Sequence, residues 1–116
     1  MLKVCLIYVG VGVAGFNTNW PNRRQPCDRE GSWVSHGIAS VGASAKKAGH
    51  KVELIDLRQL PGFERLGQQV KWAPADVYGL SVSSVDEYAA LMSIAEIKRN
   101  ATDAKIIVGG IMPTIF

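Results

Sequence analysis

Glycine and small hydroxyl residues gather directly after three predicted strands, and they are the first candidates for binding chemistry. Gly10 and Gly12 follow the first strand, Ser-Val-Ser-Ser at 81–84 follows the third, and Gly109 and Gly110 follow the fourth. In open α/β sheets, ligands bind outside the carboxyl ends of the strands. These segments bring no carboxylate pair, Ser-His-Asp set or His-Cys cluster to that edge, which disfavours acid–base catalysis. They predict a surface that binds a ligand.

Histidine and cysteine provide the other candidate chemistry. His36 stands near the start of a predicted helix, where a neutral imidazole is able to ligate a metal, although a lone histidine more often packs or faces solvent. His50 follows a helix and is expected to cap it or to be exposed. Cys5 lies in an apolar run and Cys27 in a polar loop, and two cysteines form neither a disulfide framework nor a Cys-rich metal site.

The segment from Gly10 to Gly15 matches the dinucleotide-binding pattern GxGxxG. That pattern requires a helix to begin at once, so that its N-terminus faces the pyrophosphate. Residues 16–31 instead contain asparagines and prolines that oppose a helix, and Asp56 follows at roughly twice the expected spacing of about 20 residues. The acidic residues that a phosphoacceptor domain needs after its first strand and at the end of its third strand are absent. The loop after the first strand is also not the short Ser/Thr-rich loop of an FMN site. Dinucleotide binding is therefore disfavoured.

Composition fits one globular domain. The chain has 116 residues, 47% hydrophobic and 20% charged, and this length suffices for a core without disulfides or metals. A net charge of +3 with scattered basic residues disfavours nucleic-acid binding. The uncharged run at 4–16 is too short to span a bilayer and is interpreted as a buried strand and its loop. We therefore expect a cytoplasmic protein without membrane contact.

Strands and helices are predicted to alternate along the chain. The helix predicted after Ser32 carries Ile38, Val41 and Ala45 at helical spacing, and Gly49 is expected to end it. Ser84 to Glu87 matches a capping box, which predicts a helix bearing Tyr88, Leu91 and Ala95. The remaining predicted elements are strands at 3–9, 51–57, 76–82 and 105–108 and a short helix around 63–70.

This alternation predicts an α/β fold: a Rossmann-like (flavodoxin-like) parallel sheet with helices on both faces. The chain ends soon after the fourth strand, where such a domain usually continues with a helix and a fifth strand. We therefore interpret residues 1–116 as one domain, truncated after the fourth strand, from the N-terminal part of a longer enzyme. The sheet edge left exposed could pair with another copy to form a homo-oligomer.

Three stretches in order carry a resemblance to a known family. They are GIASVGA at 37–43 with AGHKVELID at 48–56, DVYGLSVSS at 76–84, and KIIVGG at 105–110 followed by Pro113 and Thr114. Together they resemble the N-terminal cobalamin-binding domain of B12-dependent radical SAM enzymes over residues 33–116.

The resemblance implies cobalamin at the sheet edge, with its nucleotide tail beside the third and fourth strands. It also implies a C-terminal catalytic domain in the same full-length chain, with SAM and an iron–sulfur cluster, that acts as a methyltransferase or cyclase. The Asp-x-His-x-x-Gly motif for a lower cobalt ligand is absent, so base-off cobalamin is expected unless His36 substitutes. The Cys-x3-Cys-x2-Cys cluster motif is also absent, so this chain alone is not expected to be catalytic. The positions that match the cofactor site are Gly10, Gly12, Ser81, Ser83, Ser84, Gly109 and Gly110.

Two other functions stay open at this point. One is a cofactor-free Rossmann-like module for docking or dimerisation, because nothing in the sequence clearly coordinates cobalt. The other is the N-terminal half of a nucleotide-sugar glycosyltransferase, which shares the Gly-rich loop, the small-residue helix and the Ala-Gly-His-Lys-Val pattern at 48–52.

Overall fold

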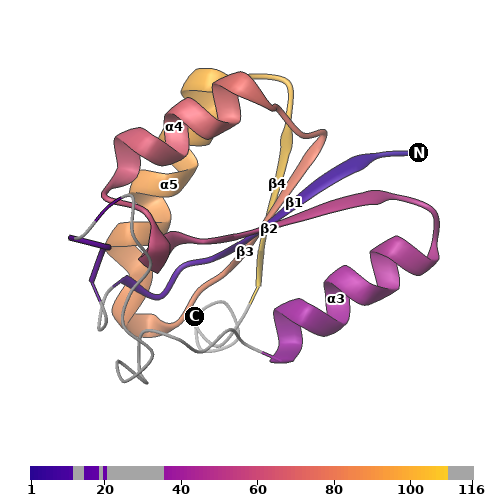
Figure 1. The fold of residues 1–116 in the computed structure, drawn as a ribbon, viewed down its shortest axis with the longest axis horizontal. Helices are drawn as coiled ribbons and strands as arrows, with labels where there is room; N and C mark the ends of the chain where they lie inside the picture. The colour runs from indigo at the N-terminus through magenta and orange to yellow at the C-terminus, as the bar shows by residue number, and fades with distance from the viewer. Residues whose placement is uncertain (12–14, 19, 21–35, 110–116) are drawn as a thin grey trace.

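Four parallel strands form a single sheet in the order β2-β1-β3-β4 (Figure 1). The computed structural model describes residues 1–11, 15–18, 20 and 36–109. The first of these strands is a near-continuous apolar run, as expected for a strand covered on both faces. The strands are β1 (Lys3–Tyr8), β2 (Lys51–Asp56), β3 (Val77–Ser81) and β4 (Lys105–Gly109).

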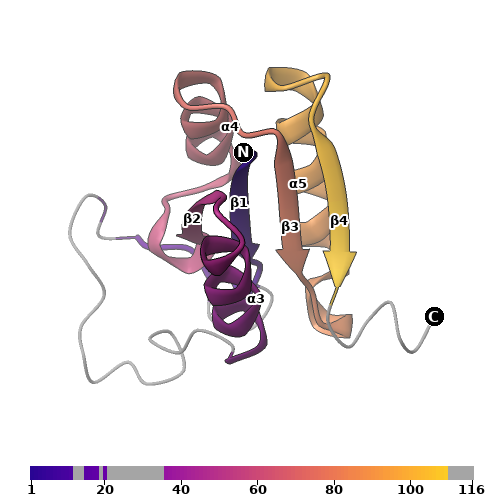
Figure 2. The same cartoon turned by 90° about the vertical axis from the view of Figure 1, so that its right-hand side faces the viewer.

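The helices cover the two faces of the sheet unequally. Helix α3 lies on one face, whereas α4 and α5 lie side by side on the other (Figure 2). This confirms the predicted α/β flavodoxin-like arrangement. The helices are α3 (His36–Lys47), α4 (Phe63–Trp72) and α5 (Glu87–Asn100), with 3-10 turns η1 (Leu57–Gln59) and η2 (Ser84–Asp86).

Gly49 ends α3 as predicted. Its φ of +94° lies in the left-handed region that favours glycine. The His50 amide donates to the Ala45 carbonyl at 3.1 Å, and the Gly49 amide donates to Lys46 at 3.0 Å, which closes the last turn. The predicted cap at Ser32 lies outside the described residues.

The main core lies between the sheet and the α4–α5 layer. Ile7, Leu66 and Ile97 are fully buried there, together with Tyr78, whose hydroxyl accepts a hydrogen bond from the Ala75 amide at 2.9 Å. Apolar burial of this kind is the main stabilising contribution to a domain of this size. Among the described residues, no helix is long and apolar enough to cross a bilayer.

The start of α5 differs from the predicted capping box. Helix α5 begins at Glu87, and the preceding 3-10 turn begins after Ser83. The Ser83 hydroxyl donates to the Asp86 carboxylate at 2.7 Å, which stabilises the tight turn at the position where we predicted the first helical turn. The predicted apolar positions Tyr88 and Leu91 are 71% and 60% exposed, because Ala89, Ala90, Ser93 and Ile97 form the buried side.

Helix α3 packs on β1 and β2. On the same face, Ile107 of β4 is 62% exposed and Val41 of α3 is 56% exposed. The chain leaves β1 toward β2 on one side, and β3 lies on the other, so the strand order reverses at β1. Such a reversal marks the usual ligand-binding position in open α/β sheets.

Candidate functional site

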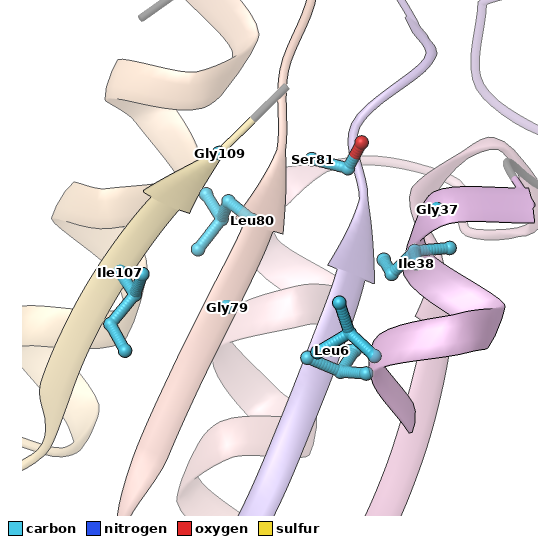
Figure 3. A pocket seen from close by; sticks show the side chains of 9 residues that line it. Leu6, Gly37, Ile38, Gly79, Leu80, Ser81, Ile107 and Gly109 are labelled. Atoms are coloured by element: carbon cyan, nitrogen blue, oxygen red, sulfur yellow. The ribbon is translucent and has the colours of Figure 1, made fainter. Parts of the chain in front are cut away.

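A groove of about 320 Å³ lies beside α3 on the face of the sheet that this helix covers (Figure 3). It extends over β3 and β4 at their carboxyl ends, next to the strand-order reversal. Its lining is formed by Leu6, Gly37, Ile38, Val41, Gly79, Leu80, Ser81, Ile107 and Gly109.

Strand register sets the floor of the groove and two of its walls. Leu6 of β1, Gly79 of β3 and Ile107 of β4 are paired neighbours in one row across the sheet. Figure 3 shows Leu6 and Ile107 on either side of Gly79, with Ile38 coming from α3. A Cβ at Gly79 would lie 2.9 Å from Leu6 Cδ2, closer than carbon atoms approach in proteins. The missing side chain at Gly79 therefore lets Leu6 occupy its present position and leaves backbone exposed between two apolar walls.

The next row on the same face of the sheet, two residues further along the strands, forms the polar end of the groove. Ser81 is paired with Tyr8 on one side and with Gly109 on the other. A Cβ built on Gly109 would meet nothing within 4 Å, so the groove is open there. Among the described lining residues, Ser81 contributes the only hydroxyl. The polar group of a ligand is therefore best accommodated at this end.

Ser83 has a different position from Ser81. Its hydroxyl donates to Asp86, a residue 5% exposed, and the Asp86 amide donates back to the Ser83 carbonyl at 3.0 Å. Ser83 thereby fixes the loop after β3 and does not line the groove. The backbone of Ser84 lies in the same turn.

Gly10 is held in a packed cluster beyond β1. A Cβ on Gly10 would collide with the Tyr8 ring and come within 3.1 Å of Arg58 Cδ. Arg58 lies over the same ring, with its guanidinium carbon 4.6 Å from the ring centroid. It also binds both carboxylate oxygens of Asp56, at 2.9 and 2.7 Å. Glycine at this position therefore allows the chain to leave β1 over a tightly packed side-chain stack.

The other predicted candidates are distributed as follows. Gly12 and Gly110 lie outside the described residues. His36 is the first residue of α3, and His50 follows the opposite end of that helix, where its Nδ1 accepts from the Leu2 amide at 3.0 Å. Within the described part of the chain, no three histidine, cysteine or acidic residues cluster as metal ligands.

The sequence predicts the rim of the groove but not the residues of its floor and walls. Ser81 and Gly109 were predicted because they end strands, whereas Leu6, Gly79 and Ile107 resemble ordinary strand residues in the sequence. Gly79 gave the available signal, because glycine inside a strand often marks close approach of a ligand or backbone.

A family model described as the B12 binding domain matches residues 28–116. The chain belongs to the B12-binding domain family. This membership supports cobalamin as the ligand. No curated protein and no solved structure matches the chain.

The groove residues fit the chemistry of cobalamin. This B12-binding domain offers apolar walls for an aromatic base, and its open glycine at Gly109 leaves room for a bulky group. Ser81 adds a hydroxyl that is able to donate or accept a hydrogen bond. The described residues of the lining include no acidic or basic side chain, so they offer no group for proton transfer.

Proposed function

We propose that this domain is the cobalamin-binding module of a B12-dependent radical SAM enzyme of the methyltransferase or cyclase type. Its partner would be a C-terminal catalytic domain in the same full-length chain, which carries SAM and an iron–sulfur cluster. The observation that carries the cobalamin part is the apolar groove at the strand-order reversal of a B12-binding domain. The ordered resemblance over residues 33–116 supports the radical SAM part.

Each part of the groove has a role in this proposal. The row of Leu6, Gly79 and Ile107 would hold the base of the nucleotide tail against the sheet. Ser81 would hydrogen-bond to the polar linkage next to the base, and the glycine at 109 lets the corrin edge approach the backbone. When bound, cobalamin supplies a cobalt centre that carries a methyl group or supports radical chemistry.

Base-off cobalamin would follow from this arrangement, because a base held in the groove would not be available to cobalt. The chain has two histidines. His50 follows the end of α3 that lies away from the carboxyl ends of the strands, and its Nδ1 accepts a hydrogen bond from the Leu2 amide. His36 is the remaining histidine that could ligate cobalt. Loss of a His-ligated spectrum in His36→Ala would give that residue a role, whereas an unchanged base-off spectrum would leave cobalt without a protein histidine.

The radical SAM assignment is tested on the full-length gene and its protein. We expect a Cys-x3-Cys-x2-Cys motif downstream, and anaerobically purified full-length protein that contains iron, sulfide and cobalamin and cleaves SAM reductively. A full-length protein that binds cobalamin but has no such motif and no cluster would contradict the radical SAM part alone. The motif would also exclude the glycosyltransferase alternative.

A cofactor-free docking module is the second candidate function. It rests on β4, which is an edge strand of the described sheet and carries the exposed Ile107. The same residue lines the groove, so docking and cofactor binding would compete for this part of the face. A protein that self-associates and binds no corrinoid in any length of chain would favour docking.

A further inference from the structure

The walls of the groove are apolar along almost their whole length. Leu6, Ile38, Val41 and Ile107 contribute aliphatic side chains, and Gly79 contributes bare backbone in the floor of the groove. Among the described lining residues, Ser81 supplies the single side-chain hydroxyl, and it ends β3, two residues beyond Gly79. A flat ring lying over Gly79 would therefore meet hydrocarbon on both edges.

Natural corrinoids differ in the ring that ends their nucleotide tail. In cobalamin this ring is a dimethylbenzimidazole with methyl groups on its outer edge. In adenine-containing corrinoids the ring carries an amino group and additional ring nitrogens. Cobinamide lacks the ring altogether. Methyl groups gain from contact with aliphatic walls, whereas an amino group covered by such walls loses its water without gaining a partner.

We propose that the groove selects corrinoids by this ring, favouring benzimidazole over adenine, and that Val41 and Ile107 are the specificity-determining residues. This inference rests on the proposed cobalamin binding. Both residues are more than half exposed in the structure, so both have apolar surface that a bound ring would cover. They come from α3 and β4, on opposite sides of Gly79, and so meet opposite edges of the ring.

Binding constants for three corrinoids test the inference on the 116-residue protein. Hydroxocobalamin, the adenine-containing corrinoid and cobinamide are each equilibrated with the protein by dialysis, and bound corrinoid is measured by visible absorbance. We expect cobalamin to bind about tenfold more tightly than the adenine form, a difference of about 1.4 kcal/mol. Equal affinities for the two complete corrinoids would overturn ring selection. Failure of all three to bind, both to this chain and to the full-length chain, would instead contradict the proposed function, and the inference with it.

Substitution of Val41 gives the sharper test. Val41→Thr keeps the shape of the side chain and adds a hydroxyl to the wall, so it should improve adenine-form binding relative to cobalamin by about threefold or more, since a neutral hydrogen bond contributes about 1 kcal/mol. Val85→Thr is the matched control, because Val85 is also exposed and lies outside the groove. An unchanged ratio in Val41→Thr, or an equal change in Val85→Thr, would contradict the role of Val41.

Truncation of Ile107 separates ring contact from a general effect on the sheet. Ile107→Ala should weaken cobalamin binding about fivefold through lost apolar contact and leave cobinamide binding unchanged. Leu54→Ala is the control, because Leu54 is exposed in the same row of the sheet and does not line the groove. Equal weakening of cobalamin and cobinamide binding by Ile107→Ala would show a structural effect and overturn its role in selection.

Discussion

Gly79 of β3 and Leu6 of β1 lie so close that a Cβ on Gly79 would come within 2.9 Å of Leu6 Cδ2. Gly79 forms the floor of the groove, and Leu6 and Ile107 form walls on either side of it. The contact between Gly79 and Leu6 links the packing of the sheet to the shape of the candidate site, because any side chain added at 79 must displace Leu6 into the groove or itself occupy that space.

Gly79→Ala should therefore weaken cobalamin binding more than it affects the fold. The flexible end of Leu6 is able to shift, and alanine is favoured over glycine in a strand, so the free energy of unfolding should change by about 1 kcal/mol or less. We expect the dissociation constant for hydroxocobalamin to rise about tenfold, an effect of about 1.4 kcal/mol. Binding is measured by dialysis and stability by urea denaturation.

Gly62→Ala is the matched control for this substitution. Gly62 has an extended backbone, with φ of 170°, and a Cβ there would meet nothing within 4 Å. This variant should bind as the unchanged protein does. Unaltered binding by Gly79→Ala would show that the groove floor does not contact the ligand.

Removing the charge of Asp56 should destabilise the fold. The Arg58 side chain is 2% exposed and holds the Asp56 carboxylate through two hydrogen bonds of 2.9 and 2.7 Å. Asp56→Asn leaves that guanidinium buried opposite a neutral amide, and it should lower the free energy of unfolding by about 3 kcal/mol. Urea denaturation measures the loss.

Arg99→Gln provides the comparison for Asp56→Asn. Its ion pair with Glu96 is also short, at 2.9 Å, but the Arg99 side chain is 67% exposed. Solvent screening should limit the loss there to less than about 1 kcal/mol. Similar losses in the two variants would show that burial of Arg58 does not decide the strength of its pair.

Alkaline pH should lower the free energy of unfolding through two titratable groups of the core, the Cys5 thiol and the Tyr78 hydroxyl. Burial, with a smaller contribution from Glu53, raises the pKa of the Cys5 thiol from 9.0 to about 12, and burial also raises the pKa of the Tyr78 hydroxyl above 10.0. Unfolded chains release these protons at a lower pH than folded chains. Stability is therefore fully present below about pH 9 and declines as the pH rises toward 12, by at most about 1.4 kcal/mol per pH unit for each proton.

Cys5→Ala isolates the thiol contribution to this decline. In a Cys27→Ser background, removal of Cys5 should flatten the loss of stability above pH 9 and leave the shape of the curve below pH 9 unchanged. Urea denaturation between pH 7 and pH 11 makes the comparison. Parallel curves with and without Cys5 over the whole range would refute the assigned role of the thiol.

Self-association is expected if the β4 edge pairs with another chain. β4 is an edge strand of the described sheet, and its outer backbone groups are the type that pair with a second strand. The mass measured by static light scattering should rise with protein concentration. A monomer mass that does not depend on concentration would contradict pairing through the β4 edge.

Much of the fold was predictable because local signals agreed with the final structure. β1 is a near-continuous apolar run, and Gly49 stands where the end of α3 requires a left-handed residue. The start of α5 was not predictable in this way, because the capping box at 84–87 predicts a helix directly after Ser84, whereas α5 begins at Glu87. The hydrogen bond from Ser83 to Asp86 stabilises the 3-10 turn that comes before α5, and it depends on how the loop leaves β3.

The candidate site was only partly predictable for a related reason. Strand ends can be read from the sequence, so Ser81 and Gly109 were identified. Leu6 and Ile107 belong to the site because strand register places them on both sides of Gly79, and because α3 packs on β1 and β2. Register and helix placement are tertiary properties, so a search for strand ends could not identify these walls.

Hydroxocobalamin binding tests the central claim most directly. The protein is mixed with hydroxocobalamin, separated by gel filtration and examined by visible spectroscopy of the protein peak, in parallel with Gly79→Val, whose larger side chain fills the groove floor. We predict that cobalamin co-elutes with the unchanged protein, shows a base-off spectrum and is lost from Gly79→Val. Colourless protein, both from this chain and from the full-length chain, would contradict the cobalamin account.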